Sequence, residues 1–435
     1  MGHEQGRPAP SGRGRDASDL ARQVRSGELR AVDAVEEHLA RLDALTQLNA
    51  VVARDDAAAL EQARRLDDAF ARSGPVGALH GVPFTVKDWI DATGLPCVGE
   101  GDDPERRPTR DSTAVARLRA AGGVLIAKTN VGVDHPVHGP CHHPVDPARS
   151  PGGSSSGEAV VVASGASPLG IGSDSGGSIR LPAAWCGAVG FKPSYGVVPT
   201  TGHYPRVGQL HDGRTVVGPL TRSARDAWLA LGVLAGPDGH DPGAVPVALG
   251  DPGSVAIPGL RVAALGASEP VEEAVGLLLA GGAAPAAGPP PSTVDEAADV
   301  TRRYWHRHRS SLTGPEADRL LLDWDRFRRR LLASAEGFDV IVSPVVAEPA
   351  PRRRAMNGDD YLWTLPWSLT GWPAMSLPWG RSDDGLPLAI QVVATTWSCH
   401  AVATTWIASG RPSSELPHGR LIAGQPVRLH GSVHR

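Results

Sequence analysis

The sequence contains few cysteines, and none lies close enough to another to form a redox or metal-binding pair. Four occur in 435 residues, far apart, at Cys97, Cys141, Cys186 and Cys399. Four cysteines are too few to cross-link a chain of this length, and their isolation is typical of a protein that stays in a reducing compartment. We therefore expect no disulfide framework.

The chain also lacks segments that would direct it to a membrane or to nucleic acid. No stretch approaches the roughly 18 consecutive apolar residues of a membrane span, and residues 1–15 are polar, without the apolar centre of a secretory signal. The formal net charge is −4 and no long basic run is present, so nucleic-acid binding has no electrostatic support. We expect a cytoplasmic protein that binds a small molecule, and a homodimer is compatible with the sequence.

What the sequence does contain is an alternation of short apolar runs with helical patterns, which predicts an α/β protein. Apolar residues spaced by three or four predict two or three helices over residues 17–72, with Asp16 or Ser18 as N-cap. Further helices are expected over 113–120, 159–163, 270–280 and 294–335. Buried strands are expected over 82–86, 124–127, 260–265 and 338–342, with several short ones over 185–198.

Three features of the sequence contain residues that could take part in catalysis. Lys87 follows the buried strand in LHGVPFTVKD, GGSSSG occupies Gly152–Gly157, and DSGGSIR runs from Asp174 to Arg180. Each of these features is weak by itself, because Lys, Gly and Ser are common residues. Their order and spacing make the combination informative.

The stretch GGSSSGEAVVVASGASPLGIGSDSGGSIRLPAAWCGAVGFKPSYG resembles the signature of the amidase signature family nearly from end to end. As in that family, Ser154 and Ser178 are 24 positions apart and the lysine lies upstream. Similar segments, among them GPLTRSARD, FDVIVSP, LTGWPAMSLP and GLPLAIQVVA, extend the resemblance over about residues 19–394.

The resemblance implies a catalytic set of one lysine and two serines. Ser178 would attack an amide carbonyl, Ser154 would bridge it to Lys87, and Lys87 would act as general base. An amide is a poor electrophile, so the reaction needs an activated nucleophile and an oxyanion site. A lysine base must be neutral, so burial has to lower its pKa from about 10.4 by several units.

The resemblance also implies residues that support this set. Backbone N–H groups would form the oxyanion hole at Ser175, Gly176 and Gly177, where glycine allows a tight turn and close approach of a substrate. Asp174 and Arg180 would brace the nucleophile loop, and Ser155 is counted with them as a supporting residue. The bridging serine follows a cis peptide bond in the family, and no metal or organic cofactor is implied.

The implied fold is a single α/β/α layered domain around a mixed, twisted central sheet. We expect it over residues 17–396, between a flexible tail at 1–16 and a divergent tail at 397–435. The implied activity is hydrolysis of a linear carbon–nitrogen amide bond, through an acyl-enzyme, to an acid and ammonia or an amine. Two alternatives stay open: the A subunit of an aminoacyl-tRNA amidotransferase, which is a glutamine amidase, and a catalytically dead homologue kept as a binding protein.

Two further interpretations come from the residues themselves. Gly153–Gly157 also fits G-x-S-x-G, the nucleophile elbow of α/β-hydrolases, with Ser155 as nucleophile. That reaction would need a downstream acid and one of the histidines His203, His211, His240, His306 and His308. Separately, one loop holds side chains of the types that bind zinc, namely His135, His138, Cys141, His142 and His143, although we expect these residues to line the rim of the pocket.

Three departures from the family fall where a substrate pocket would be shaped or covered. About seven residues are missing after Asn130, residues 266–335 are compact, and the resemblance stops near Thr395. The catalytic candidates all lie upstream of the last departure. The substrate is therefore the part of the function that the sequence specifies least.

Overall fold

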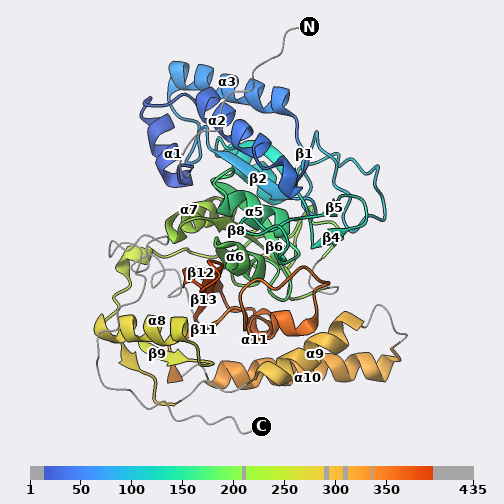
Figure 1. The fold of residues 1–435 in the computed structure, drawn as a ribbon, viewed down its shortest axis with the longest axis vertical. Helices are drawn as coiled ribbons and strands as arrows, with labels where there is room; N and C mark the ends of the chain where they lie inside the picture. The colour runs from blue at the N-terminus through green and yellow to red at the C-terminus, as the bar shows by residue number, and fades with distance from the viewer. Residues whose placement is uncertain (1–13, 208–211, 289–292, 307–311, 335–336, 395–435) are drawn as a thin grey trace.

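The computed structural model describes residues 14–207, 212–288, 293–306, 312–334 and 337–394, and its centre is one eleven-stranded sheet (Figure 1). In order across the sheet, the strands are β1 (Val51–Ala53), β3 (Val124–Thr129), β2 (Pro83–Lys87), β6 (Leu169–Asp174), β8 (Val216–Thr221), β7 (Val189–Lys192), β12 (Ala374–Arg381), β13 (Pro387–Ala394), β11 (Val340–Pro344), β9 (Arg261–Ala264) and β10 (Ala284–Pro285). A separate two-stranded hairpin consists of β4 (Asp134–His135) and β5 (Gly139–Pro140).

The helices of the described residues flank this sheet. They are α1 (Ala17–Arg25), α2 (Ala31–Asp43), α3 (Asp56–Ser73), α4 (Thr113–Ala120), α5 (Ser156–Ala163), α6 (Arg180–Cys186), α7 (Ala224–Leu234), α8 (Glu269–Ala280), α9 (Val294–His306), α10 (Gly314–Ser334) and α11 (Leu365–Thr370). None of them combines the length and the apolar character that crossing a membrane requires.

The sheet is mixed, which confirms the predicted fold class. Strand β2 runs parallel to β3 and β6, and β9 runs parallel to β10 and β11. The strands between these two sets pair in antiparallel fashion. Every residue of β2, β3 and β6 is buried, as expected for central strands covered on both faces.

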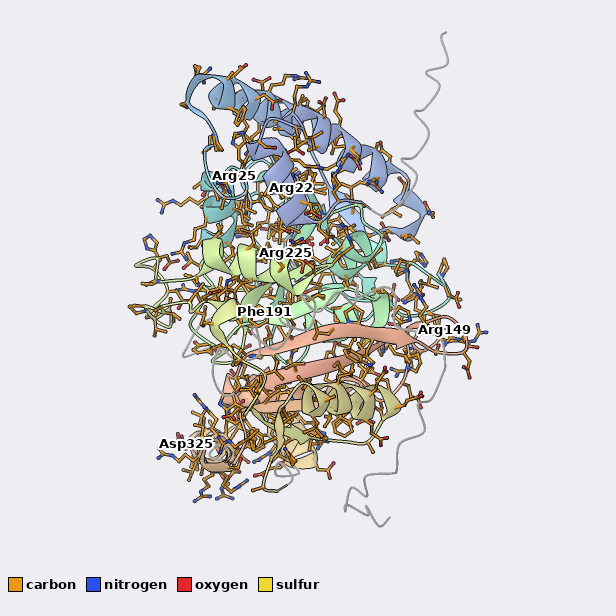
Figure 2. All side chains as sticks on the ribbon, turned by 90° about the vertical axis from the view of Figure 1, so that its left-hand side faces the viewer. Arg22, Arg25, Arg149, Phe191, Arg225 and Asp325 are labelled. Carbon is orange, nitrogen blue, oxygen red and sulfur yellow. The ribbon has the colours of Figure 1, made fainter. Side chains whose placement is uncertain are left out.

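The two ends of the molecule are helical layers, and the middle holds the most densely buried helices. Figure 1 shows α1, α2 and α3 together at one end, with α9 and α10 side by side at the other. Figure 2 shows the same separation: Arg22, Arg25 and Arg225 lie toward the first end, and Asp325 of α10 lies at the opposite one. Between them α5 and α6 pack on each other, α5 against β6 and β8 and α6 against β12 and β13.

Helix α5 approaches the strand ends so closely that its second residue has to be glycine. A Cβ atom on Gly157 would lie 2.4 Å from the carbonyl oxygen of Ala50 and 2.5 Å from the nitrogen of Asn130. Real Cβ atoms do not come that close to backbone atoms, so any other residue would push α5 away from β1 and β3. The small side chains of the motif therefore set the position of the loop that precedes this helix.

Most of the predicted elements are present, but one segment was predicted wrongly. The several short strands expected over 185–198 are a single strand, β7, and the end of helix α6 precedes it. All seven residues of α6 are buried, so the helix has no polar face and its sequence lacks the amphipathic period that signals a helix. Gly187, with φ +87°, ends it.

Asp16, one of the two predicted residues, occupies the N-cap position of the first helix, but a distant carboxylate makes the capping hydrogen bonds. Neither Asp16 nor Ser18 caps α1 with its side chain; Asp16 pairs with Arg222 at 2.8 Å instead. The acceptor is Asp226, on α7, whose carboxylate receives the N–H groups of Ala17 at 3.0 Å and Ser18 at 2.9 Å. More than 200 residues separate these partners, so no local sequence pattern could reveal the cap.

This distant cap gives a prediction about stability. Asp226→Ala leaves two N–H groups of the first turn of α1 without acceptors, and an unmade buried hydrogen bond costs about 1–3 kcal/mol. We expect the free energy of unfolding, measured by urea denaturation, to fall by that amount. Asp19→Ala, which removes a half-buried carboxylate from the same helix, should change it by less than about 0.5 kcal/mol. Equal effects of the two substitutions would contradict this account.

Candidate active site

The parallel pairing of β2 and β6 brings two polar side chains to the same edge of the sheet. Thr85 and Val86 of β2 pair with Gly170 and Ile171 of β6. The carboxyl ends of both strands therefore lie together, which is where open α/β sheets place their ligand sites. Lys87 ends β2 and Ser173 lies near the end of β6, and their side chains meet there.

Lys87 is fully buried at this edge. Its Nζ lies 2.6 Å from Oγ of Ser154 and 3.0 Å from Oγ of Ser173. The ring of Trp89 covers it at 4.1 Å from the ring centroid. Burial lowers the pKa of Lys87 to about 7, although the carboxylates of Asp174, Glu158 and Glu100 oppose the shift. A substantial fraction of the amine is therefore neutral near neutral pH.

Ser154 is held beside the nucleophile candidate through the backbone. The peptide bond between Gly153 and Ser154 is cis. The carbonyl oxygen of Ser154 accepts the N–H of Gly132 at 3.0 Å, and the N–H of the next residue, Ser155, donates to the carbonyl oxygen of Ser178 at 3.1 Å. The loop that carries Ser154 is thus hydrogen-bonded directly to the loop that carries Ser178. Ser178 itself remains partly exposed.

Asp174 and Arg180 form a buried ion pair at the base of the Ser178 loop. Nε and Nη2 of Arg180 each donate to the Asp174 carboxylate at 3.0 Å. Burial alone would raise the pKa of Asp174, but the guanidinium holds it below its ordinary value. Arg180 also donates to the carbonyl oxygen of Thr364 and to the side chains of Ser368 and Gln391, which ties the loop to α11 and β13.

The three predicted oxyanion positions differ in how free their N–H groups are. The N–H of Gly177 already donates to Asp174 at 2.7 Å, which leaves Ser175 and Gly176 of the predicted set. Gly177 has φ +141°, and a Cβ there would lie 2.3 Å from Oγ1 of Thr364, so this position requires glycine. The Ser175 hydroxyl is hydrogen-bonded to Thr215.

Aromatic side chains line the loop beside these N–H groups. The ring of Trp305, on α9, lies against Gly176, where a Cβ would be 2.9 Å from it. Trp305 meets Tyr361 edge to face, with ring centroids 6.0 Å apart. The hydroxyl of Tyr361 donates to the carbonyl oxygen of Gly153 at 3.1 Å. Tyr361 ends the short 3-10 helix η4 (Gly358–Tyr361), a segment that no motif or spacing in the sequence singles out.

Ser155 does not have the surroundings of a nucleophile. It is fully buried, and its Oγ lies 3.3 Å from the carbonyl oxygen of Ser173, beneath the loop. None of the histidines in the described residues forms a hydrogen bond with it. His203 binds Ser173 instead, at 2.9 Å, while the side chains of His211, His306 and His308 lie outside the described part of the chain.

The histidine loop does not gather its side chains around one point. The rings of His135 and His138 stack on each other. His135 is hydrogen-bonded to the carbonyl oxygen of Gly99, and His138 to the carboxylate of Asp88. His142 is hydrogen-bonded to the carbonyl oxygen of Pro147, and His143 to that of Trp185. Cys141 is buried. In the described ranges, no three His, Cys, Asp or Glu side chains form a group that could hold a metal ion.

Sequence reasoning did not connect two residues of the lysine network, Ser173 and His203, with Lys87. Ser173 lies inside the matched signature, one position before Asp174, and only the pairing of β2 with β6 shows that it reaches Lys87. His203 was considered solely as the base of a nucleophile elbow, since its distance of 116 positions from Lys87 concealed their proximity. Its imidazole reaches Lys87 through Ser173.

Glu158 is a second buried group next to this network. Its Oε2 accepts the hydroxyl of Thr85 and its Oε1 that of Thr129, both at 2.7 Å, so it joins α5 to β2 and β3. A Cβ on Gly170 of β6 would lie 2.0 Å from Oε2. Burial raises the pKa of Glu158 to about 8, although both threonine hydroxyls oppose the shift. Glu158 is therefore mostly protonated at neutral pH.

Comparison with known proteins identifies relatives that match most of this chain. The family profile described as "Amidase" matches residues 33–267 and 295–402. An acylamidase of Rhodococcus erythropolis is 31% identical over 447 residues, which cover 87% of this chain and 91% of the relative. The A subunit of the glutamyl-tRNA(Gln) amidotransferase of Streptomyces avermitilis is also 31% identical, over 87% of this chain and 91% of its own length.

Solved structures with a similar fold also include enzymes named as amidases or hydrolases. The peptide amidase of Stenotrophomonas maltophilia superposes with a TM-score of 0.77 at 26% identity, covering 92% of this chain and 98% of that one. A 6-aminohexanoate cyclic dimer hydrolase gives a TM-score of 0.76 at 26% identity, with the same coverage. These matches, together with the burial of Ser155, overturn the α/β-hydrolase interpretation of Gly153–Gly157.

The raised pKa of Glu158 predicts how a neutral replacement changes stability with pH. Its folded pKa lies above the unfolded value of about 4.3, so its contribution to stability is complete below pH ~4 and is lost as pH rises to about 8. Glu158→Gln removes this loss. We expect the variant to gain stability relative to wild type between pH 5 and pH 8, by more than about 1 kcal/mol, in urea denaturation.

The exposed Glu61→Gln, on α3, is the matched control. It should show no such gain. A constant difference between Glu158→Gln and wild type at the two pH values would contradict the raised pKa.

Proposed function

Because the chain belongs to the amidase signature family, we propose that it hydrolyses a carboxylic amide to an acid and ammonia or an amine. Ser178 is the nucleophile, Ser154 the bridging serine and Lys87 the general base. We assign this activity to residues 17–396. The reaction class follows the family, and the roles of the three residues are the part that we propose.

One observation carries the proposal: Lys87 is fully buried and its Nζ lies 2.6 Å from Oγ of Ser154. An ordinary lysine is protonated at pH 7 and cannot accept a proton. Burial brings the pKa of this one to about 7, which is close to the ideal value for a general base at neutral pH. A catalytically dead homologue would have no need to hold a costly buried amine against a serine hydroxyl.

The proposed reaction moves two protons in its first step. Oγ of Ser178 forms a bond to the amide carbon, and the carbonyl π electrons move onto its oxygen, which backbone N–H groups of the loop stabilise. The proton of Ser178 passes to Oγ of Ser154, whose own proton passes to Nζ of Lys87. The reverse transfer then protonates the leaving nitrogen as the carbon–nitrogen bond breaks, leaving an ester on Ser178.

Water completes the cycle. It attacks the ester carbon after giving a proton to Lys87 through Ser154. The carbon–oxygen bond to Ser178 then breaks, and the same proton returns to Oγ of Ser178. The acid is released and all three residues regain their starting protonation. Neither step of this scheme involves a metal or an organic cofactor.

A second candidate is the glutamine amidase of an amidotransferase, supported by the matches to amidotransferase A subunits over 87% of this chain. That activity would use the same three residues but would need partner subunits. Glutamine and small aliphatic or aromatic amides, offered to the isolated protein, separate the two. Release of ammonia from glutamine in preference to every other amide would favour the amidotransferase reading.

Covalent labelling tests the assignment of the nucleophile. A fluorophosphonate reacts with an activated serine, so we expect peptide mass spectrometry to locate the adduct on Ser178. Labelling should disappear in Ser178→Ala and slow by at least about 100-fold in Lys87→Ala, because general-base catalysis contributes roughly 10²–10⁴-fold. Ser155→Ala should still react. An adduct on Ser155, or an unlabelled but folded wild type, would refute the assignment.

The pH dependence of hydrolysis tests the assignment of the general base. The base must be neutral, so kcat/KM for any amide that is hydrolysed should rise with pH through an apparent pKa near 7, the value to which burial brings Lys87. Lys87→Arg keeps a positive charge that cannot be lost in this range and should abolish the reaction at every pH. Activity that persists unchanged to pH 5, or that survives in Lys87→Arg, would exclude Lys87 as the base.

A further inference from the structure

His203 is a buried histidine with a hydrogen-bond partner on each ring nitrogen. Nδ1 lies 2.7 Å from the carbonyl oxygen of Pro205, and Nε2 lies 2.9 Å from Oγ of Ser173. The backbone at His203 forms a bridge with Ile90, three residues after Lys87. The neighbouring Tyr204 donates its N–H to the carbonyl oxygen of Trp89 at 2.7 Å. The ring is therefore fixed relative to the lysine.

The Pro205 contact decides which nitrogen of the ring carries the proton. A carbonyl oxygen can only accept, so Nδ1 must donate to it. A neutral imidazole has one proton, which leaves Nε2 as an acceptor. The hydroxyl of Ser173 must then donate to Nε2.

The charged and titratable groups facing the ring support the neutral form. They are Lys87 on β2, Asp91 after it and Asp212 before β8. Burial is the largest effect and lowers the pKa of His203 to about 4, and Lys87 acts in the same direction against both aspartates. The imidazole is neutral across the pH range in which Lys87 titrates.

The direction of the Ser173 hydroxyl matters to Lys87. A neutral amine has two N–H groups and one lone pair. If Ser173 donated its proton to Nζ, 3.0 Å away, it would occupy that lone pair and leave none for Ser154. When Ser173 donates to His203 instead, its oxygen can only accept an N–H from Lys87. The lone pair then remains available to the hydroxyl of Ser154, 2.6 Å away.

We propose that His203 is a positioning residue for the general base: by accepting the Ser173 proton it keeps the lone pair of Lys87 directed at Ser154. The same arrangement suits both protonation states of Lys87, since Ser173 accepts an N–H from the amine and from the ammonium alike. Ser173 does not have to rotate during the reaction. This inference rests on the proposed function, because it refines the role of the same lysine.

The direct test of the inference does not depend on activity. In protein labelled with ¹⁵N-histidine, the resonances of His203, assigned by their absence in His203→Gln, should show a protonated Nδ1 and an unprotonated Nε2 at pH 7. A proton on Nε2 would overturn the inference, whether or not the protein proves to be an amidase. Failure of the proposed function would appear separately, as a folded wild type that neither labels at Ser178 nor hydrolyses any amide.

Substitutions then test the effect on the reaction. His203→Leu removes the acceptor and should lower kcat, and the rate of fluorophosphonate labelling, by about 10- to 100-fold, as expected for a misdirected catalytic group, with KM little changed. In His203→Gln the side-chain carbonyl can accept the Ser173 proton, so most of the rate should return. His38→Gln, which replaces a different buried histidine, one that lies on α2, should leave kcat unchanged.

A double-mutant cycle decides whether His203 acts through Ser173. In a Ser173→Ala background, His203→Leu should cost less than about 2-fold more, because the hydroxyl that it orients is gone. An equal loss in both backgrounds, or full activity in His203→Leu, would overturn the inference. If His203→Leu does not fold, the tautomer measurement and the comparison of His203→Gln with wild type still decide the question.

Discussion

The burial of one amine, Nζ of Lys87, is the constraint on which the rest of this site depends. A lysine in a low-dielectric interior stays neutral only if no unpaired carboxylate stabilises its charged form. Besides the exposed Glu100, two buried carboxyl groups lie near it, and the fold neutralises each of these two in a different way. Asp174 is paired with Arg180, whose guanidinium offsets its charge, and Glu158 is buried among hydroxyl groups that leave it mostly protonated at neutral pH. The amine can therefore approach neutrality at pH 7.

The sheet topology delivers the partners of this amine. Because β2 and β6 are parallel neighbours, Lys87 and Ser173 reach the same edge, and the loop that carries Ser178 follows β6 at once. Glycine at positions 157 and 177 allows α5 and the nucleophile loop to approach neighbouring atoms more closely than any side chain would permit. The Gly- and Ser-rich motif thus has a structural purpose as well as a chemical one, since it packs two loops tightly enough for Ser155 to bond Ser178 through the backbone.

Much of the fold and of the candidate site could be predicted from the sequence, for identifiable reasons. The strand leading to Lys87 is a short apolar run, and Ser154, Ser178, Asp174 and Arg180 lie in one contiguous motif whose spacing is informative. The sequence could not reveal features that depend on distant contacts or on complete burial. Helix α6 has no polar face, α1 is capped by Asp226 from another helix, and His203 reaches Lys87 only through Ser173. Such partners are set by the arrangement of the strands.

The central claim is that Lys87 is a neutral base at physiological pH, and its titration tests that claim most directly. In protein labelled with ¹³C at lysine Cε, the Lys87 resonance is assigned by its loss in Lys87→Met and followed between pH 5 and pH 11. The account predicts a pKa near 7, in line with the effect of burial. A pKa that stays near about 10.4, the value of an unperturbed lysine, would contradict it, because Lys87 could not then accept the proton of Ser154.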